Sequence, residues 1–239
     1  MSVPRAWPPL VVASALTLVC AVAAGVSAGV AGTELTRGPS AAEIRRATAE
    51  ETARRWQVWP AGKIFPATLP YVAEQGGKES ARRIGISSRT DCSAAVDAAL
   101  RVTLKAAHCR AVLRATYLDA LQGVVVTVGV AAFPDQASAL AARAAFPQGG
   151  VPSPGLRALA FPQTVADRFT AAARQSSSLA QSGPYLVVTT AGQVDGRPAR
   201  SVGRQRSTIF AFASDLAERV LRTLSVPARP DCAGKDWQC

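Results

Sequence analysis

The chain of 239 residues contains no asparagine, one histidine and only four lysines. Because asparagine is the acceptor of N-linked glycans, its absence excludes that modification. A single histidine excludes zinc sites that use a histidine pair, and no Cys-x-x-Cys motif supplies the ligands instead. The sequence also lacks a Walker A loop, a Gly-x-Gly-x-x-Gly turn and a His-Glu-x-x-His helix. We therefore predict neither a bound metal nor a cofactor.

The sequence contains no coherent set of catalytic residues. A Gly-x-Ser-x-Gly pattern, Gly25 to Gly29, lies inside a hydrophobic run, whereas a nucleophile elbow requires a strand, a turn and a helix. None of the lysines completes a Ser-x-x-Lys pair. His108 is the only base available to a serine triad, and no carboxylate can be assigned to it. The aspartates at predicted loops are interpreted as turn and cap residues: Asp119, Asp135, Asp167 and Asp195. We therefore expect a protein that is not an enzyme.

Positive charge is abundant, since 27 basic and 16 acidic residues give a formal net charge of +11. A basic surface attracts anionic lipid headgroups, acidic envelope polymers or nucleic acid. The charge concentrates in two clusters, and the second has no aromatic side chain on which bases could stack, so we do not expect nucleic acid as a partner. The candidate residues for an anionic partner are Lys78, Arg82, Arg83, Arg89, Arg197, Arg200, Arg204 and Arg206.

Residues 10–31 form an uncharged apolar run. As a helix this run would extend roughly 33 Å, close to the thickness of the hydrocarbon core of a bilayer. It exceeds the about 7–15 residues of a signal-peptide core, which favours an uncleaved transmembrane anchor. Two alternatives stay open. One is a signal peptide cleaved after Ala28, and the other is a lipoprotein modified at Cys20, which the larger Val19 before it disfavours.

The side of the membrane follows from charge and cysteines. Flanking arginines slightly favour the cytosol for the C-terminal part, but long domains translocate largely regardless of such charges. The four cysteines beyond the run are an even number, which suits an oxidising compartment. We therefore predict a single-pass membrane protein whose residues 33–239 lie outside the cytoplasm. Its predicted parts are a cytoplasmic N-terminus (1–9), the anchor (10–31), a linker and solvated stalk helix (32–56), an extracytoplasmic domain (57–224) and a disulfide-stapled tail (225–239).

Helices are predicted from capping and apolar spacing. Ser40 and Glu43 form a capping box that starts the stalk helix, which has few large apolar residues. Within the domain, apolar residues at spacings of three and four predict helices over residues 93–107, 134–146 and 207–224. In the first of these, an aspartate four positions before an arginine (Asp97 and Arg101) adds a supporting pair.

Strands are predicted from β-branched and aromatic runs. Residues 110–133 are typical of a β-hairpin and residues 184–194 of a strong strand, whereas residues 156–161 form a weaker one. Prolines confine residues 57–71 to an edge strand or an irregular segment. Polar residues predict a loop over 74–85, and residues 174–183 form a further polar stretch before the strong strand. The order of elements predicts an α+β fold, a ferredoxin-like or related two-layer sandwich with an antiparallel sheet and helices on one face.

The only histidine, His108, stands directly beside Cys109. Adjacent residues in a strand point to opposite faces, so we do not expect these two to act as nucleophile and base. An uninterrupted helix would hold Cys92 about 25 Å from Cys109, too far for a disulfide. We predict a shorter helix that lets Cys92 bond to Cys109, with Cys232 bonded to Cys239. The open alternative pairs each domain cysteine with one in the tail.

Taken together, these features predict a membrane-anchored extracytoplasmic module that binds an anionic polymer, lipid headgroups or a protein of the cell envelope without catalysis. One alternative is a secreted hydrolase that uses carboxylates on envelope polymers, which requires two carboxylates converging in a pocket. The other is an extracytoplasmic ligand-sensing domain. The nine residues before the apolar run disfavour it, because they are too few for a cytoplasmic output domain.

Overall fold

The computed structural model describes residues 7–36, 39–73, 75–201 and 207–228. Contacts within the chain divide it into two compact units, Met1–Arg45 and Arg46–Cys239. The second unit contains the β-sheet.

The described part of the first unit contains helix α1 (Trp7–Thr36) and the start of helix α2 (Ala41–Val58). The capping box predicted at Ser40 is present. Ser40 N–H donates to Glu43 Oε2 at 2.7 Å, and Glu43 N–H donates to Ser40 Oγ at 3.3 Å. Among the described residues we find no helix with the length and apolar character needed to cross a membrane. The span predicted over residues 10–31 therefore has no support from the structure.

The second unit is built on an antiparallel six-stranded sheet with the strand order β1-β2-β3-β4-β6-β5. The predicted α+β class and antiparallel sheet are confirmed, as are the hairpin, formed by β3 and β4, and the strong strand, β6. β1 is an edge strand, as its proline at position 70 requires. The strands are β1 (Thr68–Val72), β2 (Lys78–Ile86), β3 (Ala111–Leu118), β4 (Val124–Ala132), β5 (Ser176–Ser182) and β6 (Tyr185–Gln193).

Two strands differ from the prediction because their sequences are polar. Residues 74–85 are expected to be a loop and residues 174–183 are identified only as a polar stretch, but they contain most of β2 and all of β5. Only Ala81 of β2 is buried and no residue of β5 is, so neither strand has the apolar alternation that identifies a strand. Conversely, residues 156–161 do not form the predicted strand, and only Leu156 makes an isolated bridge. Whether these segments form strands therefore depends on pairing with neighbouring strands, and not on the local pattern of apolar residues.

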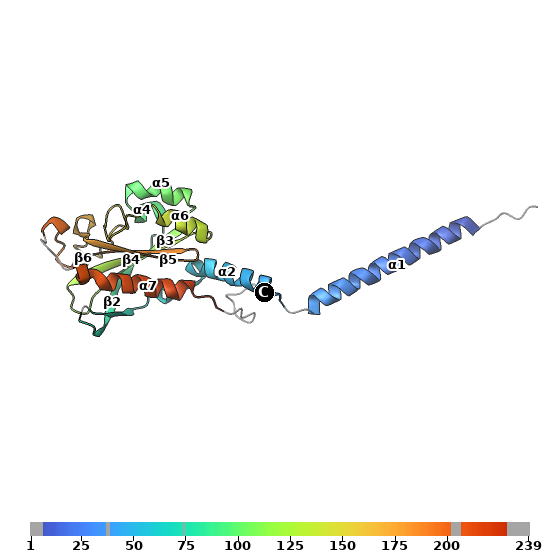
Figure 1. The fold of residues 1–239 in the computed structure, drawn as a ribbon, viewed down its shortest axis with the longest axis horizontal. Coiled ribbons are helices and arrows are strands. Elements are labelled where there is room, and N and C mark those ends of the chain that lie inside the picture. Colours follow the sequence, from blue (N-terminus) through green and yellow to red (C-terminus); the bar gives the residue numbers. More distant parts are fainter. Residues whose placement is uncertain (1–6, 37–38, 74, 202–206, 229–239) are drawn as a thin grey trace, which may run out of the picture. The chain divides into compact units, whose positions relative to one another are not determined.

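Helices cover both faces of the sheet (Figure 1), so the prediction of helices on one face is wrong. One face packs against α7 (Ala211–Ser225), and we call it the α7 face. The other, which we call the disulfide face, packs against α4 (Cys92–Ala95), α5 (Ala98–Ala106) and α6 (Gln136–Arg143). Strands β1 to β4 pair in chain order, unlike the split β-α-β of a ferredoxin-like fold. With both faces covered, every residue of β3 and β4 is buried.

Residues 147–175, most of the long segment between α6 and β5, cross the disulfide face, and we call them the covering segment. Its Leu156 belongs to the core cluster under α4 to α6. Gly129 makes room for this contact, because a Cβ atom there would come within 2.5 Å of the Leu156 side chain. Thr116 Oγ1 donates to Leu159 O at 2.7 Å. The covering segment is thus fixed to the sheet by packing and by hydrogen bonds.

The second half of α2 belongs to the domain, so the prediction of a fully solvated stalk is wrong. Glu51, Thr52 and Arg55 are buried. Arg55 Nη1 donates to the main-chain oxygens of Leu224 and Val226 at 2.8 and 2.7 Å, which are carbonyls that the end of α7 leaves unsatisfied. The contact between α2 and the end of α7 is made by the charged side chain of Arg55. A prediction based on apolar residues therefore misses it.

The final helix agrees with its prediction. α7 buries Phe212, Leu216, Val220 and Leu224 on the sheet, at the predicted spacings. The remaining described elements are short: α3 (Ala61–Ile64), η1 (Ala171–Ala173), η2 (Ala199–Ser201) and η3 (Ser207–Phe210).

Candidate functional site

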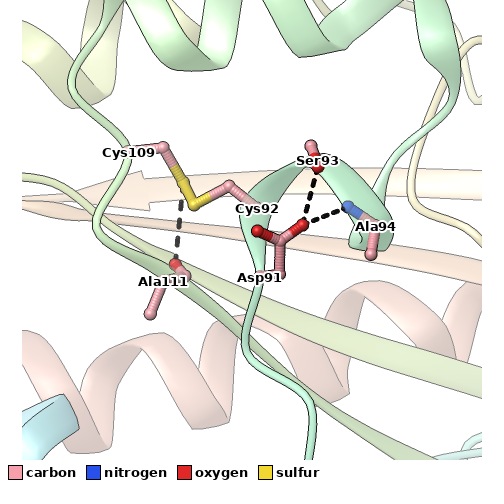
Figure 2. Close-up of a disulfide and its surroundings, with 6 residues drawn as sticks. All are labelled: Asp91, Cys92, Ser93, Ala94, Cys109 and Ala111. Atoms are coloured by element: carbon pink, nitrogen blue, oxygen red, sulfur yellow. Dashed lines mark hydrogen bonds between the residues drawn. A yellow bond between two sulfur atoms is a disulfide. The ribbon is translucent and has the colours of Figure 1, made fainter.

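A disulfide closes the segment that contains the only histidine, and the role of this segment is structural. Cys92 and Cys109 form a disulfide with their Cα atoms 6.4 Å apart (Figure 2), which confirms the predicted bond. The bond is reachable because the helix is interrupted at Val96, whose extended backbone separates α4 from α5. Asp91 caps α4 by accepting a hydrogen bond from Ala94 N–H at 2.7 Å.

The disulfide removes the thiol beside His108, so this pair cannot act as nucleophile and base. Of the cysteines in the described part of the chain, Cys20 is free and exposed. The second predicted bond, between Cys232 and Cys239, falls outside the described residues.

His108 itself ends α5. Its backbone is left-handed, with φ 56°. His108 N–H donates to Lys105 O at 3.0 Å and Cys109 N–H to Leu104 O at 2.9 Å, the two hydrogen bonds of a Schellman motif. Histidine is among the few non-glycine residues enriched in this conformation. Helix termination therefore accounts for His108 without catalysis.

Replacing His108 with glycine is expected to raise the free energy of unfolding by roughly 0.5–1 kcal/mol, because glycine has no Cβ atom to strain a left-handed backbone. Urea denaturation would measure the change. His108→Ala is the control, since alanine keeps the Cβ atom and should not stabilise. A less stable His108→Gly protein would mean that the imidazole makes a stabilising contact.

Asp97 and Arg174 clamp the covering segment to the start of α5. Arg174 Nη1 donates to Asp97 Oδ2 at 2.8 Å and to two main-chain oxygens of the covering segment. The same Oδ2 accepts from Gly155 N–H at 2.9 Å. Burial opposes the charged form of Asp97, but the hydrogen bonds from Arg174 and Gly155 outweigh it and lower the pKa of this carboxyl. The ion pair predicted with Arg101 is therefore replaced by a tertiary one.

The Asp97 clamp predicts acid sensitivity. A carboxyl whose pKa is lowered by folding contributes stability above its unfolded pKa of about 3.9, and that contribution disappears as the pH falls through the folded pKa. Asp97→Asn should therefore lower the free energy of unfolding by about 1–3 kcal/mol at pH 7. The difference from the wild type should shrink steadily as the pH falls below about 4.

Urea denaturation of both proteins between pH 7 and pH 2 would test this. Asp167→Asn is the matched control, because Asp167 is exposed and should give a small difference at every pH. A difference for Asp97→Asn that does not change with pH would contradict the assigned ion pair.

The four residues of the first predicted basic cluster do not share one surface of the structure. Lys78 and Arg82 are exposed and lie on the same side of β2, since alternate strand residues share a face. Arg83 lies on the other side, where its Nη1 donates to Phe65 O. Arg89 is exposed beyond the end of β2. Arg83 thus has a structural role, and the other three cations remain available.

The second predicted cluster contributes less. Arg197 Nε pairs with Asp195 Oδ2 at 2.5 Å, so its charge is compensated. Arg200 is exposed in η2. Arg204 and Arg206 lie outside the described residues.

An arginine outside the predicted clusters is the most unusual charged residue of the sheet. Arg114 on β3 is only 7% exposed. Its Nε is buried without a hydrogen-bond partner, and its Nη1 reaches Arg157 O at 3.5 Å, the outer limit of a hydrogen bond. No carboxylate in the described parts of the chain forms an ion pair with it. Burial, followed by the charges of Arg157 and Arg89, lowers the pKa of the Arg114 guanidinium. The sequence signal for Arg114 is its place inside a run of β-branched and apolar residues predicted to be a hairpin strand.

A cleft of about 630 Å³ at the β1 end of the sheet brings two carboxylates together. Its walls include Tyr71, Glu79 and Asp119. Tyr71 Oη donates to Glu79 Oε2 and accepts from Ala120 N–H at 3.1 Å. Burial raises the pKa of the Asp119 carboxyl, and it raises the pKa of Tyr71 to about 12.

The loop aspartates mostly cap turns, as predicted. Asp119 Oδ1 accepts from Gly123 N–H in the β3–β4 loop and from Val124 N–H at the start of β4, both at 2.8 Å. Asp135 accepts from Ser138 N–H at 2.8 Å at the start of α6. Asp195 accepts from Arg197 N–H at 3.0 Å. Asp119 alone of these combines its turn role with a place in the cleft.

The exposed cations, Arg114 and the cleft are therefore the candidate functional features of the described residues. In the described regions, no three histidine, cysteine, aspartate or glutamate side chains gather in a way that could hold a metal ion. No protein-family model matches the chain, and neither a curated protein nor a solved structure matches it.

Proposed function

We propose that the protein is a non-catalytic extracytoplasmic module that binds an anionic partner in the cell envelope. The observation that carries the proposal is positive charge without counter-charge. Lys78, Arg82 and Arg89 are exposed, and none of them forms an ion pair with a described carboxylate. Such charges are free to attract anionic polymers or headgroups.

Membrane anchoring is the part of this proposal that rests on the sequence. Its support is the uncharged run over residues 10–31, together with large apolar side chains that α1 leaves exposed. Leu16, Leu18 and Val22 are 60–69% exposed. Side chains of this kind on a continuous helix favour an apolar covering such as lipid.

Binding to a polyglycerol phosphate polymer would test the proposal, with the full chain held in an uncharged detergent. We expect an affinity that falls as salt rises, because salt screens exposed charges. The double variant Lys78→Ala/Arg82→Ala should bind about thirtyfold more weakly, since each cation near an anionic surface contributes about 1 kcal/mol.

Arg46→Ala is the matched control, because exposed Arg46 is already paired with Glu50 at 3.0 Å. Its binding should equal that of the wild type. Binding that is insensitive to salt and to the Lys78→Ala/Arg82→Ala change would refute a partner held by these charges.

Compartment can be tested separately with a membrane-impermeant thiol reagent on intact cells, read out by peptide mass mapping. If the domain is outside the cytoplasm, Cys92 and Cys109 should be labelled only after reduction. If neither is labelled even after reduction, while lysis exposes both, the domain lies inside.

A carboxylate-dependent hydrolase is the second candidate, favoured by the cleft that holds Glu79 and Asp119. A general acid needs a raised pKa, and burial raises that of Asp119. Glu79→Gln and Asp119→Asn should each abolish the release of reducing ends from an envelope polysaccharide, whereas Asp135→Asn should not. No release by the wild type would exclude this candidate for that substrate.

A further inference from the structure

Arg114 is a buried cation without a counter-ion. Burying a charge costs several kcal/mol unless it is paired and hydrogen-bonded. The protein offers Arg114 one hydrogen bond at the distance limit and leaves its Nε unpartnered. By contrast, the similarly buried Arg55 has a carboxylate at 2.6 Å and two carbonyl acceptors. The fold therefore compensates one buried arginine fully and leaves the other uncompensated.

Two further arginines are placed around Arg114 by backbone hydrogen bonds. Ser87 N–H donates to Arg114 O at 2.9 Å, and Ser87 Oγ donates to Arg89 O at 3.2 Å, which fixes Arg89 beside β3. Arg157 enters from the covering segment, where its N–H donates to Ala95 O at 2.8 Å and its carbonyl meets Arg114. The side chains of Arg89 and Arg157 are exposed.

The three like charges repel each other, so their arrangement costs free energy in the absence of an anion. Arg114 Nη2 has no hydrogen-bond partner in the described chain, yet it is not among the atoms sealed from solvent. It is therefore the Arg114 nitrogen that keeps some exposed surface and lacks an acceptor. A bound anion would supply the acceptor and the counter-charge that the protein does not.

We propose that Arg89, Arg114 and Arg157 form a binding site for a phosphate group. This deepens the proposed function and rests on it, because the phosphate would be the part of the anionic partner that is recognised specifically. Guanidinium groups donate in a planar fork that matches phosphate oxygens. Three cations suit a phosphate group, with up to two charges and three or more acceptor oxygens, better than a carboxylate with one charge and two oxygens.

Isothermal titration calorimetry tests the site. The full chain, held in an uncharged detergent, is titrated with inorganic phosphate at constant ionic strength. We expect one phosphate per chain. Arg114→Met should weaken phosphate binding at least about tenfold, the loss expected for a charge-assisted hydrogen bond. In the absence of phosphate, Arg114→Met should unfold at the same temperature as the wild type or at a higher one, because the variant no longer buries an unpaired charge. A merely structural arginine would instead lower that temperature.

Exposed variants keep the test decisive if Arg114→Met does not fold. Arg89→Ala and Arg157→Ala should each weaken phosphate binding several-fold with little change in unfolding temperature. Arg143→Ala removes an exposed arginine from α6 and should leave phosphate binding unchanged. Wild-type affinity in both the Arg89 and Arg157 variants, or no phosphate binding by the wild type, overturns the proposed site.

The source of the phosphate group can be separated in the same experiment. If phosphatidylglycerol nanodiscs compete with inorganic phosphate and phosphatidylcholine nanodiscs do not, the phosphate group belongs to a lipid headgroup. If polyglycerol phosphate competes with inorganic phosphate and neither kind of nanodisc does, the phosphate group belongs to an envelope polymer. If polymer binding responds to Lys78→Ala/Arg82→Ala but not to Arg114→Met, the site is refuted while the proposed function stands. If inorganic phosphate binds but no polymer or lipid does, the site stands and the envelope function fails.

Discussion

Replacing Arg55 with methionine is expected to lower the free energy of unfolding by about 3–5 kcal/mol, the largest effect of any single charged residue in the domain. Arg55 is 2% exposed, and its Nε and Nη2 donate to the buried carboxylate of Glu51 at 2.6–2.9 Å. Its Nη1 satisfies the carbonyls of Leu224 and Val226. Methionine would leave a buried anion and two carbonyls without partners.

The same helix offers the matched control for Arg55→Met. Arg46 and Glu50 have the same spacing of four residues, but their side chains are 82% and 57% exposed. An exposed pair contributes only about 0.3–0.5 kcal/mol, so Arg46→Met should be nearly neutral. Urea denaturation of the three proteins measures both changes. Equal losses for the two variants would contradict the docking of α2 onto the end of α7.

The second large effect is expected from the disulfide. Cys92→Ser/Cys109→Ser should lower the free energy of unfolding by about 3 kcal/mol, since a bond between residues 17 apart restricts the unfolded chain by that amount in the loop-closure account. Thermal and urea unfolding would measure the loss. α4 should loosen first, because the disulfide joins it to Cys109 in the turn between α5 and β3.

Chemical reduction of the wild type should reproduce the loss seen in Cys92→Ser/Cys109→Ser. Cys20→Ser is the control, because Cys20 is free and exposed, and it should unfold like the wild type. A double variant as stable as the wild type would show that the helix break at Val96, and not the disulfide, fixes α4.

The carboxylate cleft shows why a local interpretation of a residue can be correct and still incomplete. Asp119 was predicted to be a turn residue, and it is one, since it accepts hydrogen bonds from Gly123 N–H in the β3–β4 loop and from Val124 N–H at the start of β4. Its proximity to Tyr71 and Glu79 arises because β1 and β2 lie beside β3 in the sheet. Nothing near Asp119 in the sequence predicts that neighbourhood.

Local sequence determined the elements whose signals lie within a few residues of each other. The capping box at Ser40, the apolar stripe of α7 and the β3–β4 hairpin follow from periodicity and from short-range hydrogen bonds. The Cys92–Cys109 bond was one of two pairings that the sequence left open, and it required a helix shorter than the apolar pattern indicates.

Tertiary structure alone decided the features that depend on residues far apart in the chain. β2 and β5 are strands because a neighbouring strand pairs with their backbone, whatever the polarity of their side chains. Arg55 reaches Leu224 across 169 positions, and Arg174 reaches Asp97 across 77. Arg114 becomes a buried cation only when the covering segment closes over β3. Local patterns report which backbone conformation a segment prefers. Burial and counter-charge depend instead on the segments that pack against it, and these are distant in the sequence.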